Sequence, residues 1–186
     1  MRLFRLHRLL GVGTFLAMII AFTVSAGDNE MKEVKEQSIN WFFFSDQVMG
    51  GKSQGKAVFL SNETVNYVRL QGDVTTVNNG GFIQIRTSVS NLEKELEGIT
   101  LKIRGNGQRY YVFVRTSGTI MPWQYYKADF PSEKNWAEVK LKFKDFVRSS
   151  SWLAKTIRPD SIKSIGIVAF GRDHNALIDL ADLKFF

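Results

Sequence analysis

The chain has 186 residues, no cysteine, and 25 basic against 18 acidic side chains, which gives a net charge of +7. The lack of cysteine excludes disulfides, a cysteine-linked lipid anchor and any thiolate metal site. Three arginines lie near the N-terminus, so the chain beyond residue 26 carries 22 basic and 18 acidic side chains, or +4. Because these charges are interleaved, as on a solvated surface, we expect no nucleic-acid partner.

Residues 1–26 have the organisation of a secretory signal peptide. Arginines precede an uncharged run of 16 residues, 9–24, and the segment ends in Val24-Ser25-Ala26. A basic start, an apolar centre and an A-x-A-like end are typical of a cleaved signal, and the run is shorter than the roughly 20 residues that cross a bilayer. We expect export to a periplasm or the cell surface, with no stable membrane insertion after cleavage. Retention as an uncleaved anchor is the alternative.

The rest of the chain predicts strands. Residues 27–38 are polar and charged and predict a flexible lead-in to one domain over residues 39–186. From there apolar and polar residues alternate with a period of two, which is typical of strands with one face on a core. In GITLKIRG, Ile99, Leu101 and Ile103 share one face. The other alternating runs are TVNYVRLQG, GGFIQIRT, RYYVFVRT, WAEVKLKF, IKSIGIVAF and ALIDLADLKFF.

Turns rich in glycine or polar residues separate these runs at residues 78–81, 105–107 and 171–175. Only residues 91–97, NLEKELE, have a helical pattern, with Asn91 as the expected N-cap, and RPDSI predicts a short turn. Nine or ten strands without crossover helices predict an all-β fold, an antiparallel β-sandwich or jelly roll.

The segment SDQVMGGKSQG, residues 45–55, contains two catalytic patterns that its context does not support. G-K-S-Q-G fits the nucleophile elbow of a serine hydrolase, but that elbow needs a following helix and strand-like residues follow Ser53. G-K-S fits the end of a P-loop, but Asp46 stands where that loop needs a glycine, and its carboxylate would repel phosphate. We therefore expect neither activity.

No other catalytic or metal-binding constellation is evident. Beyond residue 26 the one histidine is His174, which we expect in a solvated polar loop, and no spacing of acids indicates a catalytic pair. The sequence therefore predicts no enzyme activity, no cofactor and no zinc or iron site. Oxygen ligands near Asp46, Asp173 or Asp179 leave a structural calcium ion as an open alternative, although no EF-hand spacing is present.

Five blocks of sequence together resemble the complex-I-intermediate-associated protein 30 family. They are Trp41 with DQVMGGKSQG, GDVTTVNNGGFIQIRT, GITLKIRGNGQRYYVFVRT, YYKADF with WAEVKLKFKDF, and SIKSIGIVAFGRDHNALIDLADLKFF, and they span residues 41–186. The resemblance implies a β-sandwich of the galactose-binding-like kind. Eukaryotic members act in mitochondria as assembly factors for respiratory complex I, a role that does not transfer automatically to a chain with a secretory signal.

The resemblance brings forward candidate site residues in the segment SDQVMGGKSQG, residues 45–55, which we call the signature loop, and two arginines outside it. Two interpretations of the loop stay open: its residues fix a tight turn between strands, or they form part of a ligand or partner surface. Arg86 and Arg115 each end a run in RT, and we expect each at a rim of the sandwich, clamping a carboxylate or contacting a substrate. Asp46 is the expected carboxylate. The loop residues concerned are Asp46, Gly50, Gly51 and Ser53.

Two functions from different classes follow. The resemblance favours a non-catalytic protein-binding module, similar to an assembly factor or chaperone and acting on envelope proteins, with Trp123 and Trp152 as anchors. The alternative is a carbohydrate-binding module with Trp123 and Arg115 in one cleft, where a sugar ring stacks on an aromatic face. Fold alone does not decide between them. Packing of both tryptophans in the core or at its rim is the structural alternative.

Overall fold

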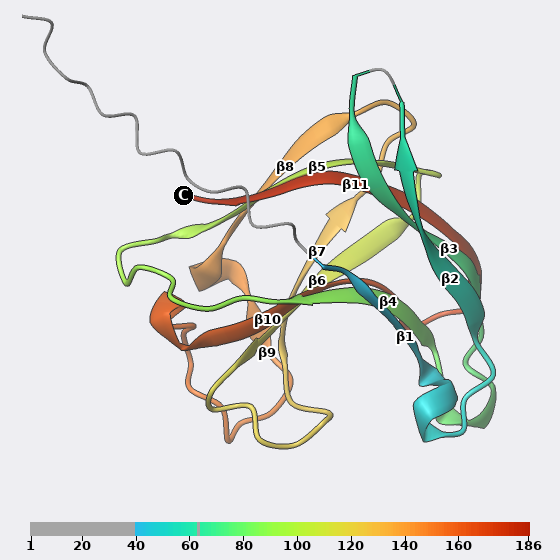
Figure 1. Cartoon of the computed structure of the whole chain (residues 1–186). Coiled ribbons are helices and arrows are strands. Elements are labelled where there is room, and N and C mark those ends of the chain that lie inside the picture. The colour runs from blue at the N-terminus through green and yellow to red at the C-terminus, as the bar shows by residue number, and fades with distance from the viewer. Residues whose placement is uncertain (1–39, 63) are drawn as a thin grey trace, which may run out of the picture. The chain divides into compact units, whose positions relative to one another are not determined.

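The computed structural model describes residues 40–62 and 64–186, and this part of the chain forms two antiparallel sheets packed face to face (Figure 1). The predicted antiparallel β-sandwich is therefore confirmed. The signal peptide predicted for residues 1–26 and the lead-in predicted for residues 27–38 lie outside the described residues. In the described part, none of the helices has the length and apolar character needed to cross a membrane.

Eleven strands build the two sheets within the described residues. The six-stranded sheet has the order β1 (Phe42–Ser45), β4 (Phe82–Ser88), β10 (Ile162–Phe170), β6 (Arg109–Thr116), β7 (Tyr126–Pro131) and β9 (Val147–Arg148). The five-stranded sheet has the order β2 (Gln54–Ser61), β3 (Asn66–Val74), β11 (His174–Phe185), β5 (Gly98–Gly105) and β8 (Ala137–Lys142). Four short 3-10 helices connect strands: η1 (Asp46–Met49), η2 (Val77–Asn79), η3 (Phe143–Asp145) and η4 (Pro159–Ser161).

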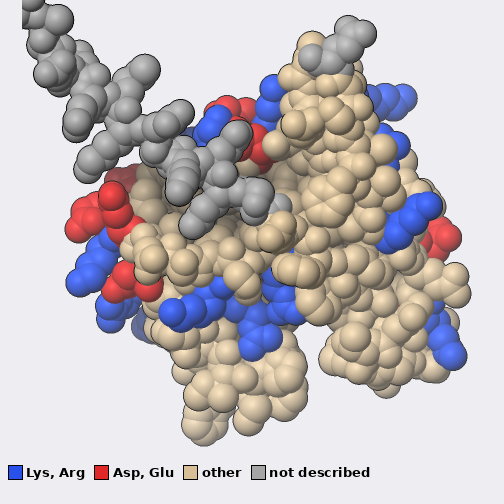
Figure 2. All heavy atoms as spheres, in the orientation of Figure 1, with Lys and Arg blue, Asp and Glu red and all other residues tan. Residues whose placement is uncertain are grey.

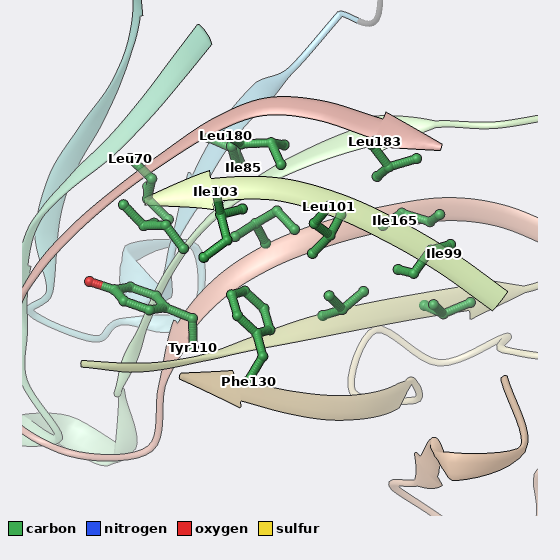
Figure 3. Packing of buried hydrophobic residues seen from close by; sticks show 14 of the residues in the cluster. Leu70, Ile85, Ile99, Leu101, Ile103, Tyr110, Phe130, Ile165, Leu180 and Leu183 are labelled. Carbon is green, nitrogen blue, oxygen red and sulfur yellow. The ribbon is translucent and has the colours of Figure 1, made fainter. Parts of the chain in front are cut away.

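The alternation read from the sequence decides which side chains form the core. Ile99, Leu101 and Ile103 of β5 are fully buried, and so are Ile83 and Ile85 of β4. Figure 3 shows side chains of both sheets meeting in one layer, with Leu101 and Leu180 from the five-stranded sheet and Ile85, Ile165 and Phe130 from the six-stranded sheet. The polar residues between them consequently face outward.

The helix predicted for residues 91–97 is wrong. The segment forms a turn, and Asn91 takes a left-handed φ of 57° instead of capping a helix. Leu92 and Leu96 pack against the core from this irregular segment, and the backbone amide of Glu97 donates to the carbonyl of Phe186 at 2.7 Å. A seven-residue helix is marginal by itself, so these tertiary contacts decide the conformation. The short turn predicted in RPDSI is present as η4.

The structure has more strands than the nine or ten that the sequence predicts, in part because two of them are very short. Strand β1 has four residues and β9 has two. Runs of this length carry too little alternation to be recognised.

Tyr110 is a buried polar link between the sheets. Its hydroxyl donates to Asn106 Oδ1 at 2.8 Å and accepts a hydrogen bond from the backbone amide of Leu177, also at 2.8 Å. Burial raises the pKa of Tyr110 to about 12, although the Leu177 hydrogen bond and the charge of Arg172 act against this. The hydroxyl therefore joins the turn after β5 to β11.

We expect Tyr110→Phe to lower the free energy of unfolding by about 1–3 kcal/mol, because the Leu177 amide is left buried without its acceptor. Urea denaturation of both proteins measures the change. Tyr111→Phe is the matched control, since Tyr111 faces outward and its hydroxyl has no hydrogen bond within the described residues. Equal losses in the two variants would contradict the prediction.

Candidate functional site

The signature loop is organised around a buried carboxylate. Asp46 has no exposed surface, and its two oxygens accept hydrogen bonds from the backbone amides of Ser53 (2.9 Å), Gly81 (2.5 Å) and Phe82 (3.2 Å). The hydroxyl of Ser53 donates to the same carboxylate at 2.5 Å. Asp46 thereby ties η1 and the start of β2 to the turn that precedes β4.

The glycines of the signature are needed because the carboxylate is so tightly enclosed. A Cβ atom at Gly51, or at Gly80 on the opposing turn, would overlap the Asp46 carboxyl group. Gly50 takes a left-handed φ of 86° at the end of η1, which only glycine adopts without cost. In this conformation the polar groups of Asp46 and Ser53 point into the protein, which gives them a loop-fixing role. Their contribution to a binding surface stays a prediction.

The hydrogen bonds also set the charge of Asp46. Burial by itself raises the pKa of this carboxyl, but the hydrogen bonds from Gly81, Ser53 and Phe82 outweigh burial, and the net pKa lies below its ordinary value of 3.8. Asp46 is therefore a carboxylate throughout the neutral range.

The predicted pairing of Arg86 or Arg115 with Asp46 is wrong, because the oxygens of Asp46 are held by other donors. Arg115 instead donates to three carbonyl oxygens of the loop after β6, those of Thr119 (2.9 Å), Met121 (3.1 Å) and Pro122 (3.3 Å). It clamps a loop and not a carboxylate. The guanidinium of Arg86 lies over the ring of Phe44, 4.4 Å from its centroid.

Arg86 belongs to the outer face of the six-stranded sheet. In the register of the sheet, Gly166 of β10 lies between Arg86 of β4 and Phe113 of β6, and Phe113 is paired with Lys127 of β7. The ring of Phe113 is stacked on that of Tyr125 at 4.0 Å, with the two planes 8° apart. The outer aromatic cluster consists of Tyr111, Phe113, Tyr125 and Phe170.

Cations predominate beside this cluster. Lys127 lies over the rings of Tyr111 and Phe170, at 5.8 and 5.5 Å from their centroids. The one acid beside it on the strand, Asp129, is paired with Arg109 at 3.2 Å. Figure 2 shows lysine and arginine side chains gathered in a band across the middle of the displayed face, near the strands labelled β4 and β10 in Figure 1.

A second surface lies on two loops at the β9 edge of this sheet. Residues 117–125 and 149–157 are joined through Ser149, whose amide donates to the carbonyl of Tyr125 at 2.9 Å and whose hydroxyl accepts from the Tyr125 amide at 3.0 Å. These loops and β9 expose five large apolar side chains, which we call the apolar rim: Ile120 (82% exposed), Met121 (46%), Trp123 (64%), Val147 (61%) and Trp152 (91%).

The candidate residues therefore separate into two groups. Asp46, with Gly50, Gly51 and Ser53, follows β1 at one edge of the six-stranded sheet, whereas Trp123 and Trp152 lie at the β9 edge. Arg115 and Trp123 do come close, because Arg115 binds the carbonyl of Pro122. The exposure of both tryptophans shows that neither is a core residue.

Sequence reasoning missed a polar cluster on the other sheet. Asp179 of β11 is buried and binds Arg69 of β3 through two hydrogen bonds, at 2.7 and 2.9 Å, and Arg104 of β5 at 2.7 Å. Arg104 also lies over the rings of Trp136 (4.6 Å) and Tyr67 (5.1 Å). Burial raises the pKa of Asp179, but the two arginines outweigh burial and the pKa is lowered. The charged residues stand in the sequence, but their pairing depends on strand register.

Each of the three acids named for calcium accepts hydrogen bonds within the described residues. Asp46 accepts from backbone amides and Asp179 from two arginines. Asp173 accepts hydrogen bonds from the amide and hydroxyl of Thr76, at 2.7 and 2.8 Å. Over residues 40–62 and 64–186, no group of three or more histidine, aspartate or glutamate side chains is placed to hold a metal ion.

The expectation for His174 is also wrong. It opens β11, where it pairs with Val74, and is partly buried. Its Nδ1 lies 2.8 Å from the carbonyl oxygen of Arg172, while its Nε2 is buried and lacks a hydrogen-bond partner among the described residues. Burial lowers the pKa of this imidazole, so the ring is neutral at pH 7.

We expect Asp46→Asn to lower the free energy of unfolding by about 1–3 kcal/mol at neutral pH, because an amide NH2 would face the hydrogen-bond donors of the loop. The folded pKa of Asp46 is depressed. The difference from the unchanged protein is therefore fully present above the ordinary pKa of 3.8 and is lost as the pH falls through the folded value. Urea denaturation as a function of pH measures it.

Asp129→Asn is the control for this prediction. Asp129 is 51% exposed in a surface ion pair, and such pairs contribute about 0–1 kcal/mol. A pH-independent difference for Asp46→Asn, or an equal effect of Asp129→Asn, would rule out the buried carboxylate as the stabilising group.

Comparison with solved structures identifies the fold. The family 11 carbohydrate-binding module of a cellulosomal cellulase from Clostridium thermocellum has a TM-score of 0.65 and 16% identity over 82% of this chain and 90% of that chain. The complex of a family 11 module from the same organism with a β-1,3-1,4-mixed-linked tetrasaccharide gives the same TM-score and identity, and the match covers 82% of this chain and 91% of that chain. A family 30 carbohydrate-binding module has a TM-score of 0.53 and 12% identity, and the match covers 73% of this chain and 91% of that chain. These identities show the fold alone.

Comparison by sequence identifies the family. No curated protein matches the chain. The family model described as complex I intermediate-associated protein 30 matches residues 30–178, which include the signature loop and most of the strands. The resemblance inferred from the five sequence blocks is thereby confirmed, and the chain belongs to the complex I intermediate-associated protein 30 family.

Proposed function

We propose that this chain is a non-catalytic protein-binding module that resembles an assembly factor and holds its partner on the apolar rim. The observation that carries the proposal is the exposure of Trp152 (91%) and Trp123 (64%) on two loops that are hydrogen-bonded to each other. Exposed apolar side chains gathered on one surface mark interaction sites, and tryptophan is enriched among the residues that carry binding energy.

The way these loops are held supports a preformed surface. Arg115 fixes the first loop through three carbonyl oxygens, and Arg148 fixes the second through the carbonyls of Ser151 (3.1 Å) and Leu153 (2.7 Å). A surface that is ordered before binding loses less conformational entropy when a partner docks. The lower left lobe of Figure 2, where the loop after β6 lies in Figure 1, presents no charged side chain on the displayed side.

The family and the N-terminal pattern support the rest of the proposal. Membership of the complex I intermediate-associated protein 30 family favours a role in assembly. The signal-like segment favours export, so the partner is an envelope protein of the periplasm or cell surface. The lack of a catalytic constellation in the sequence favours a binding role over an enzymatic one.

We expect Trp152→Ala to abolish capture of the partner without changing the melting temperature. In-cell crosslinking of the full chain followed by mass spectrometry measures capture. Phe59→Ala is the matched control, because Phe59 is also an exposed aromatic residue (63%) but lies on β2 of the other sheet. A protein that is enriched with the unchanged chain and with Phe59→Ala, but not with Trp152→Ala, supports the proposal. Enrichment that all three share contradicts it.

A second candidate function is carbohydrate binding on the outer aromatic cluster. The stacked pair of Phe113 and Tyr125 favours it, because sugar rings pack against aromatic faces. Two of the structures with this fold are modules described as carbohydrate-binding. The outer face of the six-stranded sheet, and not a cleft at Trp123, is the surface concerned.

For this second candidate, we expect an oligosaccharide at about 100 times its dissociation constant to stabilise the protein by roughly 2.7 kcal/mol. A thermal-shift panel of oligosaccharides tests it. Phe113→Ala removes half of the stacked pair and should abolish the shift, whereas Trp136→Ala on the other sheet should retain it. A panel without any shift would eliminate carbohydrate binding.

A further inference from the structure

Among the described residues, Arg86 has no partner for its charge on the outer face of the six-stranded sheet. Its side chain is only partly exposed and lies on the ring of Phe44. Within the described residues it forms no ion pair and no hydrogen bond. Two further arginines on this face are engaged elsewhere: Arg115 donates to backbone carbonyls, and Arg109 is paired with Asp129. The guanidinium of Arg86 therefore keeps its full set of donors for a ligand.

The electrostatic environment of Arg86 favours an anion. Burial lowers the pKa of its guanidinium, and the nearby positive charge of Arg115 lowers it further. Arginine nevertheless stays charged in proteins. A partly desolvated cation beside a second cation is stabilised when an anion binds, and the planar guanidinium fits a carboxylate through two parallel hydrogen bonds.

The side chain of Gln84 lies between Arg86 and Phe113 on this face. Gly166 separates Arg86 from Phe113 in the register of the sheet and is buried, so the surface between them is formed by the neighbouring side chains. The Gln84 side chain covers this glycine, since its Oε1 would lie 3.0 Å from a Cβ atom at Gly166. Arg86 and Phe113 are two strand spacings apart, or about 10 Å. One ligand that reaches both must therefore be longer than a single carboxylate.

These three side chains offer three kinds of contact to one ligand. The guanidinium of Arg86 offers a site for a carboxylate, and the amide of Gln84 can donate to and accept from hydroxyl groups. The ring of Phe113, which is partly exposed and stacked on Tyr125, offers apolar surface. We infer that the outer face of the six-stranded sheet binds an acidic saccharide, a chain that contains uronate residues, with a uronate carboxylate on Arg86 and a sugar ring near Phe113.

This inference rests on the second candidate function, carbohydrate binding, and names its ligand class. Oligogalacturonate and its methyl ester form the matched probe pair, because the ester keeps the sugar chain and removes the charge. Isothermal titration of the purified full chain measures both affinities. We expect the acid to bind about 10-fold to 100-fold more tightly than the ester, the range expected for hydrogen bonds to a charged group.

Substitutions assign this preference to Arg86. We expect Arg86→Gln to bind the acid and the ester equally, and its melting temperature shows whether it is folded. Lys56→Gln is the charge-matched control, because Lys56 is exposed on β2 of the other sheet, and it should keep the full preference. Lys127→Gln changes a second cation of the same face without touching Arg86, and should reduce the preference by less than Arg86→Gln.

The possible outcomes separate this inference from the function on which it rests. Equal binding of acid and ester overturns the inference and leaves carbohydrate binding in place, whereas no binding of any saccharide in the panel overturns both. An acid preference that persists in Arg86→Gln, or that is lost equally in Lys56→Gln, also overturns the inference, since the charge recognised would not be that of Arg86. A glutamate-rich peptide that binds as tightly as oligogalacturonate would show that the ligand is not a saccharide.

Discussion

Burial of one face of the central strands is the constraint on which the rest of this structure depends. Side chains alternate across a strand with a period of two, so the packing of Ile83 and Ile85 in the core places Gln84 and Arg86 outside. A shift of one residue in register would exchange the two faces. The outer face that we propose as a ligand site is therefore set by the same hydrophobic burial that holds the two sheets together.

Two buried carboxylates show how the sandwich keeps its irregular parts in place. The charge of Asp46 is stabilised by hydrogen bonds from three backbone amides and one hydroxyl, and Asp46 thereby fixes loops at one edge of the six-stranded sheet. Asp179 is neutralised by Arg69 and Arg104 and joins three neighbouring strands of the other sheet. Both stay ionised because hydrogen bonds to the charged form outweigh the cost of burial.

The two proposed binding surfaces have different chemistry. The apolar rim consists of large apolar side chains on loops at the β9 edge, whereas the outer face combines aromatic rings with the cations Arg86 and Lys127. Arg115 connects the two, because its stem rises from the outer face and its guanidinium holds the carbonyls of the loop that carries Trp123. Loops on a rigid sandwich are common carriers of binding residues.

The sequence by itself determined the sandwich and the faces of its strands, because alternation is a local pattern: Ile99 and its neighbours lie in the core as predicted. It also determined the family, through the order of its motifs. Only the tertiary structure decided that residues 91–97 form no helix, that Asp179 pairs with Arg69, 110 positions away, and that Arg86 has no carboxylate partner among the described residues. These outcomes depend on contacts between distant strands, and strand register cannot be read from local pattern.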